Sequence, residues 1–266
     1  MDKTLLFPLF TLLLFISCKK DIEIDYHEVA PLYVVEAAVT NDGMQARIST
    51  TNAMDDNSTT SDISGASVVI TGSDGTSETL DYTSDGTYRS AATGTPGVEY
   101  RIDITLDGQH FTSTSVMQKM PAINTFSFFW KKILQEKLLM GELLFQDIPN
   151  EENWYFIHLY RNQKGLRWSV KRDDLNPDME LQQLFTFGVE DSDDDDMLHD
   201  GDRLHLELRA IDQRTYDYFY SMQIMDSTGT NPIQNFTGGC LGYFSAYSEA
   251  AYDIVFLEGR LEIRED

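Results

Sequence analysis

The densest charge in the chain is a run of acidic residues that could bind a cation. It reads Asp191-Ser192-Asp193-Asp194-Asp195-Asp196, and Asp200 and Asp202 follow it. Ca²⁺ takes about six to eight oxygen ligands, and the carboxylates of Asp191, Asp193 and Asp195 are spaced closely enough to supply several. The run lacks the glycine and the terminal glutamate of an EF-hand loop, and blocks of like charge are usually solvated. A solvated acidic loop is therefore the preferred interpretation, and a calcium site is the alternative.

A glycine-rich segment, Gly238-Gly239-Cys240-Leu241-Gly242, could bind phosphate or present a reactive thiol. It lacks the lysine and the Ser or Thr of a phosphate-binding loop, and it is not a GxGxxG turn between a strand and a helix. Glycine is favoured where φ is positive or where two backbone segments come close together. The segment therefore predicts a tight backbone crossing, with Cys240 as a small buried residue rather than a nucleophile.

The sequence contains no recognisable catalytic motif. Its five histidines show no HExxH or other paired metal spacing, and no GxSxG elbow is present. The 44 acidic residues could include a carboxylate pair for glycoside hydrolysis, but their spacing singles out no pair. We therefore expect no enzymatic activity, no catalytic residue and no cofactor. His158 and His205 are expected in strands, with cross-strand or surface roles; the others are His27, His110 and His199.

Two segments are dense in aromatic residues, which stack on sugar rings or anchor partner proteins where they are exposed. One contains Phe126, Phe128, Phe129 and Trp130, and the other runs from Tyr243 to Tyr247. We expect most of these rings to belong to a core. Successive residues of a strand point to opposite faces, so Phe128-Phe129-Trp130 places rings on both faces. At least one of these faces therefore needs cover from another element or from a partner.

Charge and cysteine content narrow the possible partners. The chain has 266 residues and a formal net charge of −24, which argues against nucleic acid and anionic lipid headgroups. A basic or neutral surface, or bound divalent cations, would suit this charge better. The two cysteines, Cys18 and Cys240, can form neither a disulfide framework nor a cysteine zinc site if Cys18 is lipidated.

The N-terminus has the layout of an export signal. Lys3 is followed by an apolar run, Leu5 to Ile16, that stops at Ser17-Cys18. A run of about 12 residues is shorter than the roughly 20 that span a bilayer, so a transmembrane anchor is the weaker interpretation. We interpret residues 1–17 as a signal peptide and Cys18 as the lipidated residue, although Phe15 stands where a lipobox usually has Leu. Ordinary secretion and an uncleaved signal are the alternatives.

Residues 18–30 are then a lipidated tether. Its start, Lys19-Lys20-Asp21-Ile22-Glu23-Ile24-Asp25, resembles the acidic export tag that Bacteroidetes-type bacteria place behind the lipidated cysteine of surface-displayed lipoproteins. A solvated tether without an export role is the alternative. The N-terminus thus predicts an exported protein held on a membrane by its lipid anchor.

Residues 31–120 have the pattern of an antiparallel β-sandwich with about seven strands. Short alternating segments are separated by clusters of Gly, Asp, Asn and Ser. From Tyr100 to Leu106 the apolar residues fall on one face of a strand and the polar residues on the other. Asp107-Gly108 is a hairpin signal that leads into a second strand, from Gln109 to Val116.

Pro121 marks the boundary to a second β unit, residues 121–266. Asp147-Ile148-Pro149-Asn150 is expected to be a turn in it. Asp212 is a good N-cap for a helix whose Phe219, Met222 and Met225 follow one another at three-residue spacing, and we expect this helix to pack across a sheet. The expected strands are 126–133, 138–145, 154–160 and 204–210.

The order of several short motifs resembles the domain of unknown function 4249 family of Bacteroidetes outer-membrane lipoproteins. Each motif is weak alone, but together they extend over most of the chain, from about residue 22 to residue 256. Behind the lipidated cysteine they are Val34-Val35-Glu36, Gly65 to Ile70, Asp85-Gly86-Thr87-Tyr88, Pro96 to Tyr100, Asp107 to Thr114, Gly201-Asp202-Arg203-Leu204, Tyr216 to Tyr220, Asn231-Pro232 and Gly238 to Tyr247.

The resemblance implies an immunoglobulin- or transthyretin-like N-terminal β-sandwich, a β-rich α+β domain with one principal helix, and an outer-membrane location. It also implies a non-enzymatic accessory role, as ligand capture or lid, at a TonB-dependent receptor, because such lipoproteins are commonly encoded beside these receptors. We expect the protein to face the cell exterior. A structural or adhesion module without a transport role is the alternative, and an extracellular hydrolase is a weaker third hypothesis. The family supplies no catalytic residues.

Overall fold

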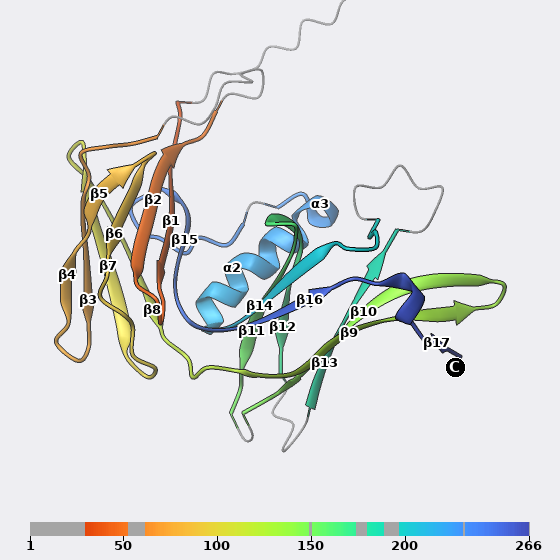
Figure 1. Cartoon of the computed structure of the whole chain (residues 1–266). Helices are drawn as coiled ribbons and strands as arrows, with labels where there is room; N and C mark the ends of the chain where they lie inside the picture. Colours follow the sequence, from red (N-terminus) through yellow and green to blue (C-terminus); the bar gives the residue numbers. More distant parts are fainter. Residues whose placement is uncertain are drawn as a thin grey trace, which may run out of the picture. The chain divides into compact units, whose positions relative to one another are not determined.

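The computed structural model describes residues 30–52, 62–148, 151–173, 180–188, 197–230 and 232–265. Residues 31–266 form one compact unit (Figure 1). Its described part contains four β-sheets, which pack face to face as two pairs. Each pair encloses its own cluster of buried hydrophobic side chains. The unit therefore consists of two β-sandwiches, and the prediction of a mainly β fold is confirmed. Within the described residues, no helix combines the length and apolarity needed to cross a membrane.

The first sandwich pairs a five-stranded sheet, in the order β15-β1-β2-β6-β5, with a four-stranded sheet, in the order β4-β3-β7-β8. The described part of residues 31–120 holds eight strands, where about seven were predicted. Their bounds are β1 (Tyr33–Val39), β2 (Met44–Thr50), β3 (Ser67–Gly72), β4 (Ser77–Thr79), β5 (Asp81–Ser84), β6 (Thr87–Ser90), β7 (Glu99–Leu106) and β8 (Gln109–Val116), and β15 is Leu241–Ala246.

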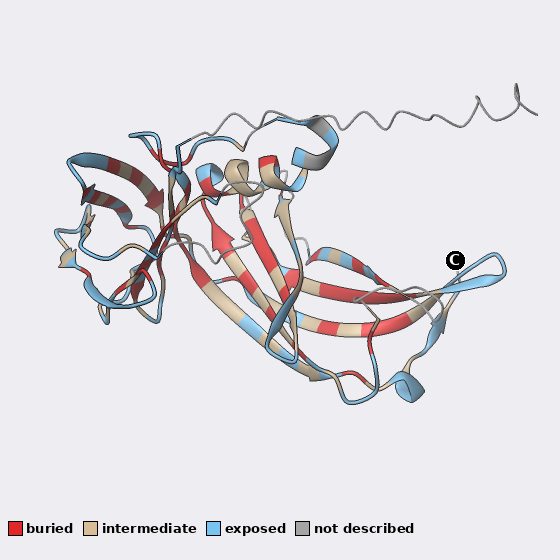
Figure 2. Ribbon diagram, turned by 90° about the horizontal axis from the view of Figure 1, so that it is seen from above, coloured by how far each residue is buried: buried red, intermediate tan, exposed pale blue. Residues whose placement is uncertain are grey.

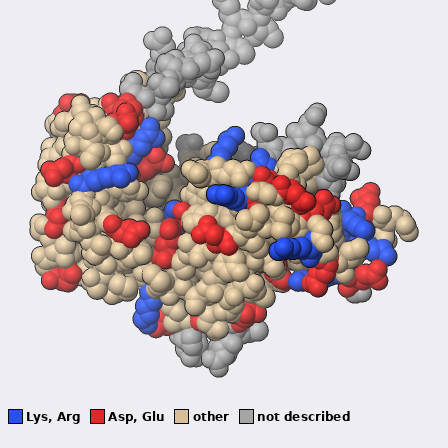
Figure 3. Space-filling view, viewed as in Figure 1, with Lys and Arg blue, Asp and Glu red and all other residues tan. Residues whose placement is uncertain are grey.

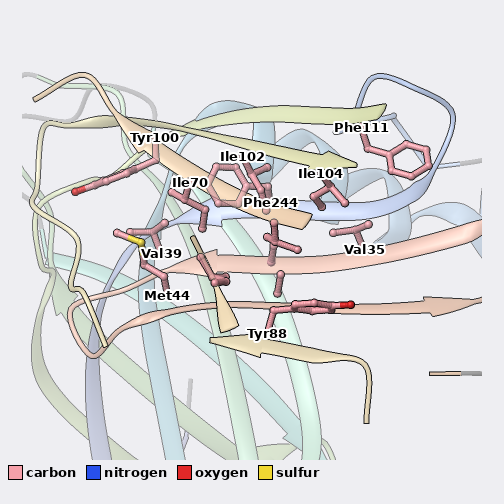
Figure 4. Close-up of a cluster of buried hydrophobic side chains, with 14 of the residues drawn as sticks. Val35, Val39, Met44, Ile70, Tyr88, Tyr100, Ile102, Ile104, Phe111 and Phe244 are labelled. Carbon is pink, nitrogen blue, oxygen red and sulfur yellow. The ribbon is translucent and has the colours of Figure 1, made fainter. Parts of the chain in front are cut away.

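Strict alternation builds the core of this sandwich. In β7, Tyr100, Ile102 and Ile104 are buried, while the residues between them point outward. Figure 4 shows these side chains converging with those of the opposite sheet, among them Tyr88 and Phe244. Asp107 and Gly108 both have positive φ, as the predicted two-residue hairpin between β7 and β8 requires.

One strand of the first sandwich comes from the far end of the chain. β15 lies parallel to β1, and Val35 pairs with Gly242. The expectation of a sandwich built from residues 31–120 missed this strand. Parallel neighbours need a long connection, so no short turn signal announces their pairing.

The second sandwich pairs a sheet in the order β13-β10-β9-β17 with a sheet in the order β12-β11-β14-β16. Side chains from both sheets meet in a second buried cluster. Its strands are β9 (Ala122–Ile133), β10 (Glu136–Gln146), β11 (Trp154–Arg161), β12 (Lys164–Arg172), β13 (Glu180–Phe187), β14 (Arg203–Ile211), β16 (Ser248–Val255) and β17 (Ile263–Arg264), and a short 3₁₀ helix, η2 (Glu258–Arg260), precedes β17.

The aromatic run in β9 is covered on both faces. Phe126 and Phe128 belong to the core between the two sheets, and Trp130 packs against that core. Phe129 points to the other face, yet only 5% of it is exposed. The guanidinium carbon of Arg264 lies 3.9 Å from the centre of its ring, so the C-terminal strand supplies the cover that the sequence required.

The principal helix, α2 (Gln213–Gln223), begins where it was predicted. Asp212 is the N-cap, and its Oδ1 accepts a hydrogen bond from Thr215 N at 2.9 Å. Its Oδ2 accepts another from Val116 N at 2.9 Å, which ties the helix to β8. Phe219 packs against the second sandwich. The expected inward face was wrong at Met225, which is exposed and begins the short helix α3 (Met225–Thr228).

Candidate functional site

The outer face of the sheet that contains β11 and β14 carries a group of aromatic and charged side chains. Because side chains alternate along a strand, Tyr155 and Ile157 enter the core of the second sandwich, while Phe156, His158 and Tyr160 point outward. The same alternation on β14 points Glu207 and Arg209 outward. This face does not meet solvent over its whole area, since α2 and part of the first sandwich pack against it.

A hollow of about 430 Å³ lies between this face and the first sandwich. We call it the junction cleft. A second hollow, of about 340 Å³, shares four of its lining residues, Gln45, Arg89, Arg209 and Tyr247. The junction cleft is lined by Glu36, Ala37, Ala38, Gln45, Ala46, Arg47, Thr87, Arg89 and Tyr243 from the first sandwich, and by Phe156, His158, Tyr160, Arg209, Phe219 and Tyr247.

Arg209 is fixed on its wall of the junction cleft by two carboxylates and two aromatic rings. Its Nε donates to Glu249 Oε2 at 2.8 Å, and its Nη2 donates to Glu207 Oε2. Its guanidinium carbon lies 4.7 Å from the ring centre of Tyr247 and 5.4 Å from that of Phe156. Burial opposes its charge, but Tyr247 and the two carboxylates outweigh burial, so the pKa of Arg209 is raised and the side chain stays charged.

The aromatic wall beside Arg209 is uncharged at neutral pH. Burial, with a smaller contribution from Arg209, lowers the pKa of His158. Burial also raises the pKa of Tyr160 to about 12, and its hydroxyl donates to Glu207 Oε2 at 3.2 Å. Phe219 closes the cleft from the side of α2, with its ring centre 4.5 Å from that of Phe156. The cleft therefore combines an apolar wall with fixed polar groups, as small-molecule sites do.

Two side chains of the opposite wall have spare hydrogen-bonding capacity. Gln45 and Arg89 are neighbours across β2 and β6, and both are exposed. Their side chains make no hydrogen bond or ion pair with any residue that the structure describes. Arg89 offers the fixed fork of a guanidinium, and Gln45 offers both a donor and an acceptor. A ligand that enters the junction cleft can therefore bind here without breaking an existing contact.

Several predicted site residues lie outside the described residues. They are Cys18, His27 and the calcium candidates Asp191, Asp193 and Asp195. Asp200 and Asp202, which follow the acidic run, are described, and their carboxylates accept hydrogen bonds from backbone N–H groups. Asp202 Oδ2 accepts a hydrogen bond from His199 N at 2.9 Å, and Asp200 Oδ1 accepts one from Glu258 N at 2.6 Å. Among the described residues, no cluster of three or more His, Cys, Asp or Glu side chains could hold a metal.

His158 and His205 both lie in strands, as predicted, but only His205 has the predicted cross-strand role. His205 Nδ1 lies 2.8 Å from Asp253 Oδ1 on the neighbouring strand, and His158 lines the junction cleft. Sequence reasoning did not single out Phe156, Glu207 or Arg209. The available signal was the polar set on the outward positions of β14, which reads equally well as a solvent-facing side.

The glycine-rich segment is a close backbone crossing. An added Cβ at Gly238 would overlap the carbonyl oxygen of His110, and one at Gly242 would overlap that of Val35. Both glycines have positive φ. Cys240 is 3% exposed and belongs to the core of the first sandwich. The prediction of a tight backbone crossing with a buried Cys240 is confirmed.

Cys240 is expected to resist modification in the folded protein. Burial raises the pKa of its thiol to about 12, so the thiolate stays a small minority up to at least pH 9. In a Cys18→Ala background, where Cys240 is the remaining cysteine, we expect no labelling by a small maleimide between pH 7 and pH 9. Denaturant should restore full labelling at the same pH. Stoichiometric labelling of the folded protein would contradict the buried placement of this thiol.

These features define a mainly β protein of two sandwiches with an amphipathic cleft at their junction. The chain belongs to the family described as Domain of unknown function (DUF4249), whose model matches residues 19–253. No curated protein sequence matches it.

Two solved structures are similar to the chain at low identity. A two-domain fibronectin type III segment of chicken tenascin matches at 9% identity with a TM-score of 0.25, over 85% of this chain and 100% of the other. A DUF4785 family protein from Legionella pneumophila matches at 15% identity with a TM-score of 0.24. That match covers 68% of this chain and 52% of the other, so the chain corresponds to about half of the Legionella protein.

Proposed function

We propose that this protein is a lipid-anchored outer-membrane lipoprotein that captures a ligand in the junction cleft, as a non-enzymatic accessory to a TonB-dependent receptor. The cleft is the observation that carries the proposal. Its walls hold a fixed arginine, uncharged aromatic side chains and two side chains with spare hydrogen-bonding capacity. A binding role needs only these groups. Membership of the DUF4249 family and the lipoprotein-like N-terminus support the location at the cell exterior.

A tether makes weak binding sufficient for such a role. An acylated Cys18 would hold the cleft near the mouth of a receptor, and tethering raises the effective concentration of bound ligand to about the millimolar range. The protein surface is compatible with selective contacts, because acidic and basic side chains are interspersed on the face seen in Figure 3. No single-sign patch covers the described part of that face.

The tip of the β9–β10 hairpin is the surface best suited to contact the receptor. Ile133 and Leu134 are 42% and 87% exposed there (Figure 2). Leu134 has a φ of +56° in a two-residue turn, a position that Gly or Asn occupies at lower cost. A bulky apolar residue that is both strained and exposed does not serve the stability of the turn. The exposed, strained Leu134 therefore supports a role of this hairpin tip in contacting another protein.

Co-purification tests the proposal directly. A C-terminally tagged protein is extracted gently in detergent from its native outer membrane, and mass spectrometry identifies what accompanies it. We expect a β-barrel receptor in near-stoichiometric amount. Leu134→Gly should reduce its recovery at least about tenfold without lowering the melting temperature, because Gly suits the positive φ. Tyr82→Ser, at a 48% exposed position of the first sandwich, is the matched control and should leave recovery unchanged.

Recovery of the protein alone, under crosslinking as well as in detergent, would overturn the accessory role and leave a structural or adhesion module. Turnover of a polymer by the purified protein would overturn the non-enzymatic part of the proposal.

Cys18→Ala is expected to release the protein from the membrane. Without the acylated cysteine, the apolar stretch before it is too short to serve as a stable span. Fractionation should find the variant in the soluble fraction, with a melting temperature equal to that of the detergent-solubilised parent. Persistent retention in the outer-membrane fraction would mean that another part of the chain provides the main attachment.

A further inference from the structure

Two aspartates at one end of the second sandwich are buried beside each other, and no basic side chain of the described residues pairs with them. Asp147 follows β10 and is 3% exposed, and Asp173 follows β12 and is 1% exposed. The backbone N–H of Asp173 donates to the carbonyl oxygen of Asn153 at 2.9 Å, which fixes Asp173 against the start of β11. The pair therefore joins the ends of strands from both sheets of the sandwich.

The hydrogen bonds of this pair are incomplete. Asp147 Oδ1 accepts a hydrogen bond from the hydroxyl of Tyr155 at 2.7 Å. Asp147 Oδ2 and both carboxylate oxygens of Asp173 accept no hydrogen bond from an N–H or hydroxyl group of the described residues. No lysine, arginine or histidine of the described residues forms an ion pair with either carboxylate. Within the part of the chain that the structure describes, these three buried carboxylate oxygens thus have no N–H donor and no cation to compensate for the water they have lost.

Two uncompensated carboxylates do not persist together in a protein interior. Burial raises the pKa of Asp147; the hydrogen bond from Tyr155 opposes this shift, and a hydrogen bond with the carboxyl group of Asp173, together with the charge of that group, adds to it. Either the pair shares a proton or a cation balances its charge. A shared proton and a bound cation both reduce the negative charge of the pair. Added calcium stabilises only the cation-bound state, whereas a lower pH stabilises only the state with a shared proton.

We propose that Asp147 and Asp173 bind one Ca²⁺ ion between the ends of β10, β11 and β12. The three free carboxylate oxygens supply part of the oxygen set that Ca²⁺ requires, and backbone carbonyls and water complete it. The site has two carboxylate residues and so falls short of a cluster of three acidic, His or Cys ligands. Ca²⁺ accepts such irregular oxygen sets, whereas Mg²⁺ demands a near-ideal octahedron.

The surrounding backbone is already held in place for this role. The side-chain Nδ2 of Asn153 donates to the carbonyl oxygens of Ile148 at 3.1 Å and of Glu151 at 3.0 Å. These bonds pin the chain on both sides of the connection between β10 and β11. A bound cation would clamp the two sheets of the second sandwich together at this end, so its expected effect is on stability rather than on chemistry.

Calcium titration of the intact lipoprotein in detergent tests the site. After removal of metals with EDTA at pH 7.5, we expect CaCl₂ to bind with a stoichiometry of one per chain by calorimetry. Saturating CaCl₂ should raise the melting temperature by about 5 °C or more, and MgCl₂ should raise it less. Asp173→Asn should abolish both the binding and the shift. Asp147→Asn is the second variant, in case the first one does not fold.

The acidic run provides the matched control. A variant with Asp191→Asn, Asp193→Asn and Asp195→Asn removes the same kind of charge elsewhere and should keep the full calcium shift. The proposal is wrong if this triple variant loses the shift and Asp173→Asn keeps it. It is also wrong if wild-type protein ignores CaCl₂ and gains stability from pH 7.5 to pH 5.5. A carboxyl group whose pKa is raised by folding stabilises the protein as it takes up its proton, so that result would assign a shared proton to the pair.

Discussion

Gly242→Ala is expected to lower the free energy of unfolding by about 4 kcal/mol and the melting temperature by about 10 °C, which can suffice to prevent folding. Gly242 pairs with Val35 between the parallel strands β15 and β1 and has a φ of +100°. An added Cβ would overlap the carbonyl oxygen of Val35 and lie 2.7 Å from its carbonyl carbon. These are backbone atoms in the middle of a sheet, so neither strand can yield without loss of the pairing. Thermal unfolding followed by circular dichroism measures the effect.

Gly239→Ala is the matched control for this prediction. Gly239 has a similar φ of +91° and belongs to the same segment, but nothing lies within 4 Å of an added Cβ. Its cost should therefore be the conformational strain of alanine at positive φ, about 1 kcal/mol. Equal losses in the two variants would show that the φ angle, and not the close approach of β1, makes glycine necessary at Gly242.

Arg209→Ala is expected to cost about 3–5 kcal/mol of stability and about 10 °C in melting temperature. The side chain of Arg209 is 16% exposed and bridges Glu207 on its own strand to Glu249 on β16. Its removal leaves two carboxylates facing each other in a poorly hydrated place, and it also removes the cation that covers the rings of Phe156 and Tyr247. Denaturant titration at neutral pH measures the loss.

Two further variants separate charge from packing at this position. Arg203→Ala, at the exposed start of the same strand, should change stability by no more than about 0.5 kcal/mol. Arg209→Met combined with Glu207→Gln and Glu249→Gln should recover most of the lost stability, because it removes the stranded charges and keeps the volume. A triple variant as unstable as Arg209→Ala would contradict the electrostatic explanation and point to the ring contacts instead.

Local patterns predicted the elements that depend on local physics. The alternation in Glu99–Leu106, the Asp107-Gly108 turn and the N-cap at Asp212 each involve residues a few positions apart, and each is found as predicted. The pairing of β15 with β1 could not be predicted in this way. Nothing in residues 241–246 indicates that they pair with a strand about 200 positions earlier in the chain. The pairing depends on the assembly of the complete first sandwich.

The junction cleft could be predicted only in part. Alternation on β11 and β14 predicts which side chains point away from the core of the second sandwich. It does not predict which elements pack against those side chains. Glu207 and Arg209 have the same pattern as a solvated strand face, and the arrival of α2 and the first sandwich turns this face into a cleft wall. Asp147 is a second example: the sequence predicted only that it lies in a turn, and tertiary packing buries it beside Asp173.

Because β15 pairs with β1, the first strand of the fold has no partner on this edge until a late part of the chain has been synthesised. Ribosomes synthesise a polypeptide from its N-terminus, so β1 emerges about 200 residues before the strand that covers its edge. During that interval the edge of β1 presents unpaired N–H and C=O groups, which can template intermolecular pairing. A chain truncated before residue 241 therefore never hides this edge. Incomplete chains are therefore more prone to aggregation or degradation than complete ones.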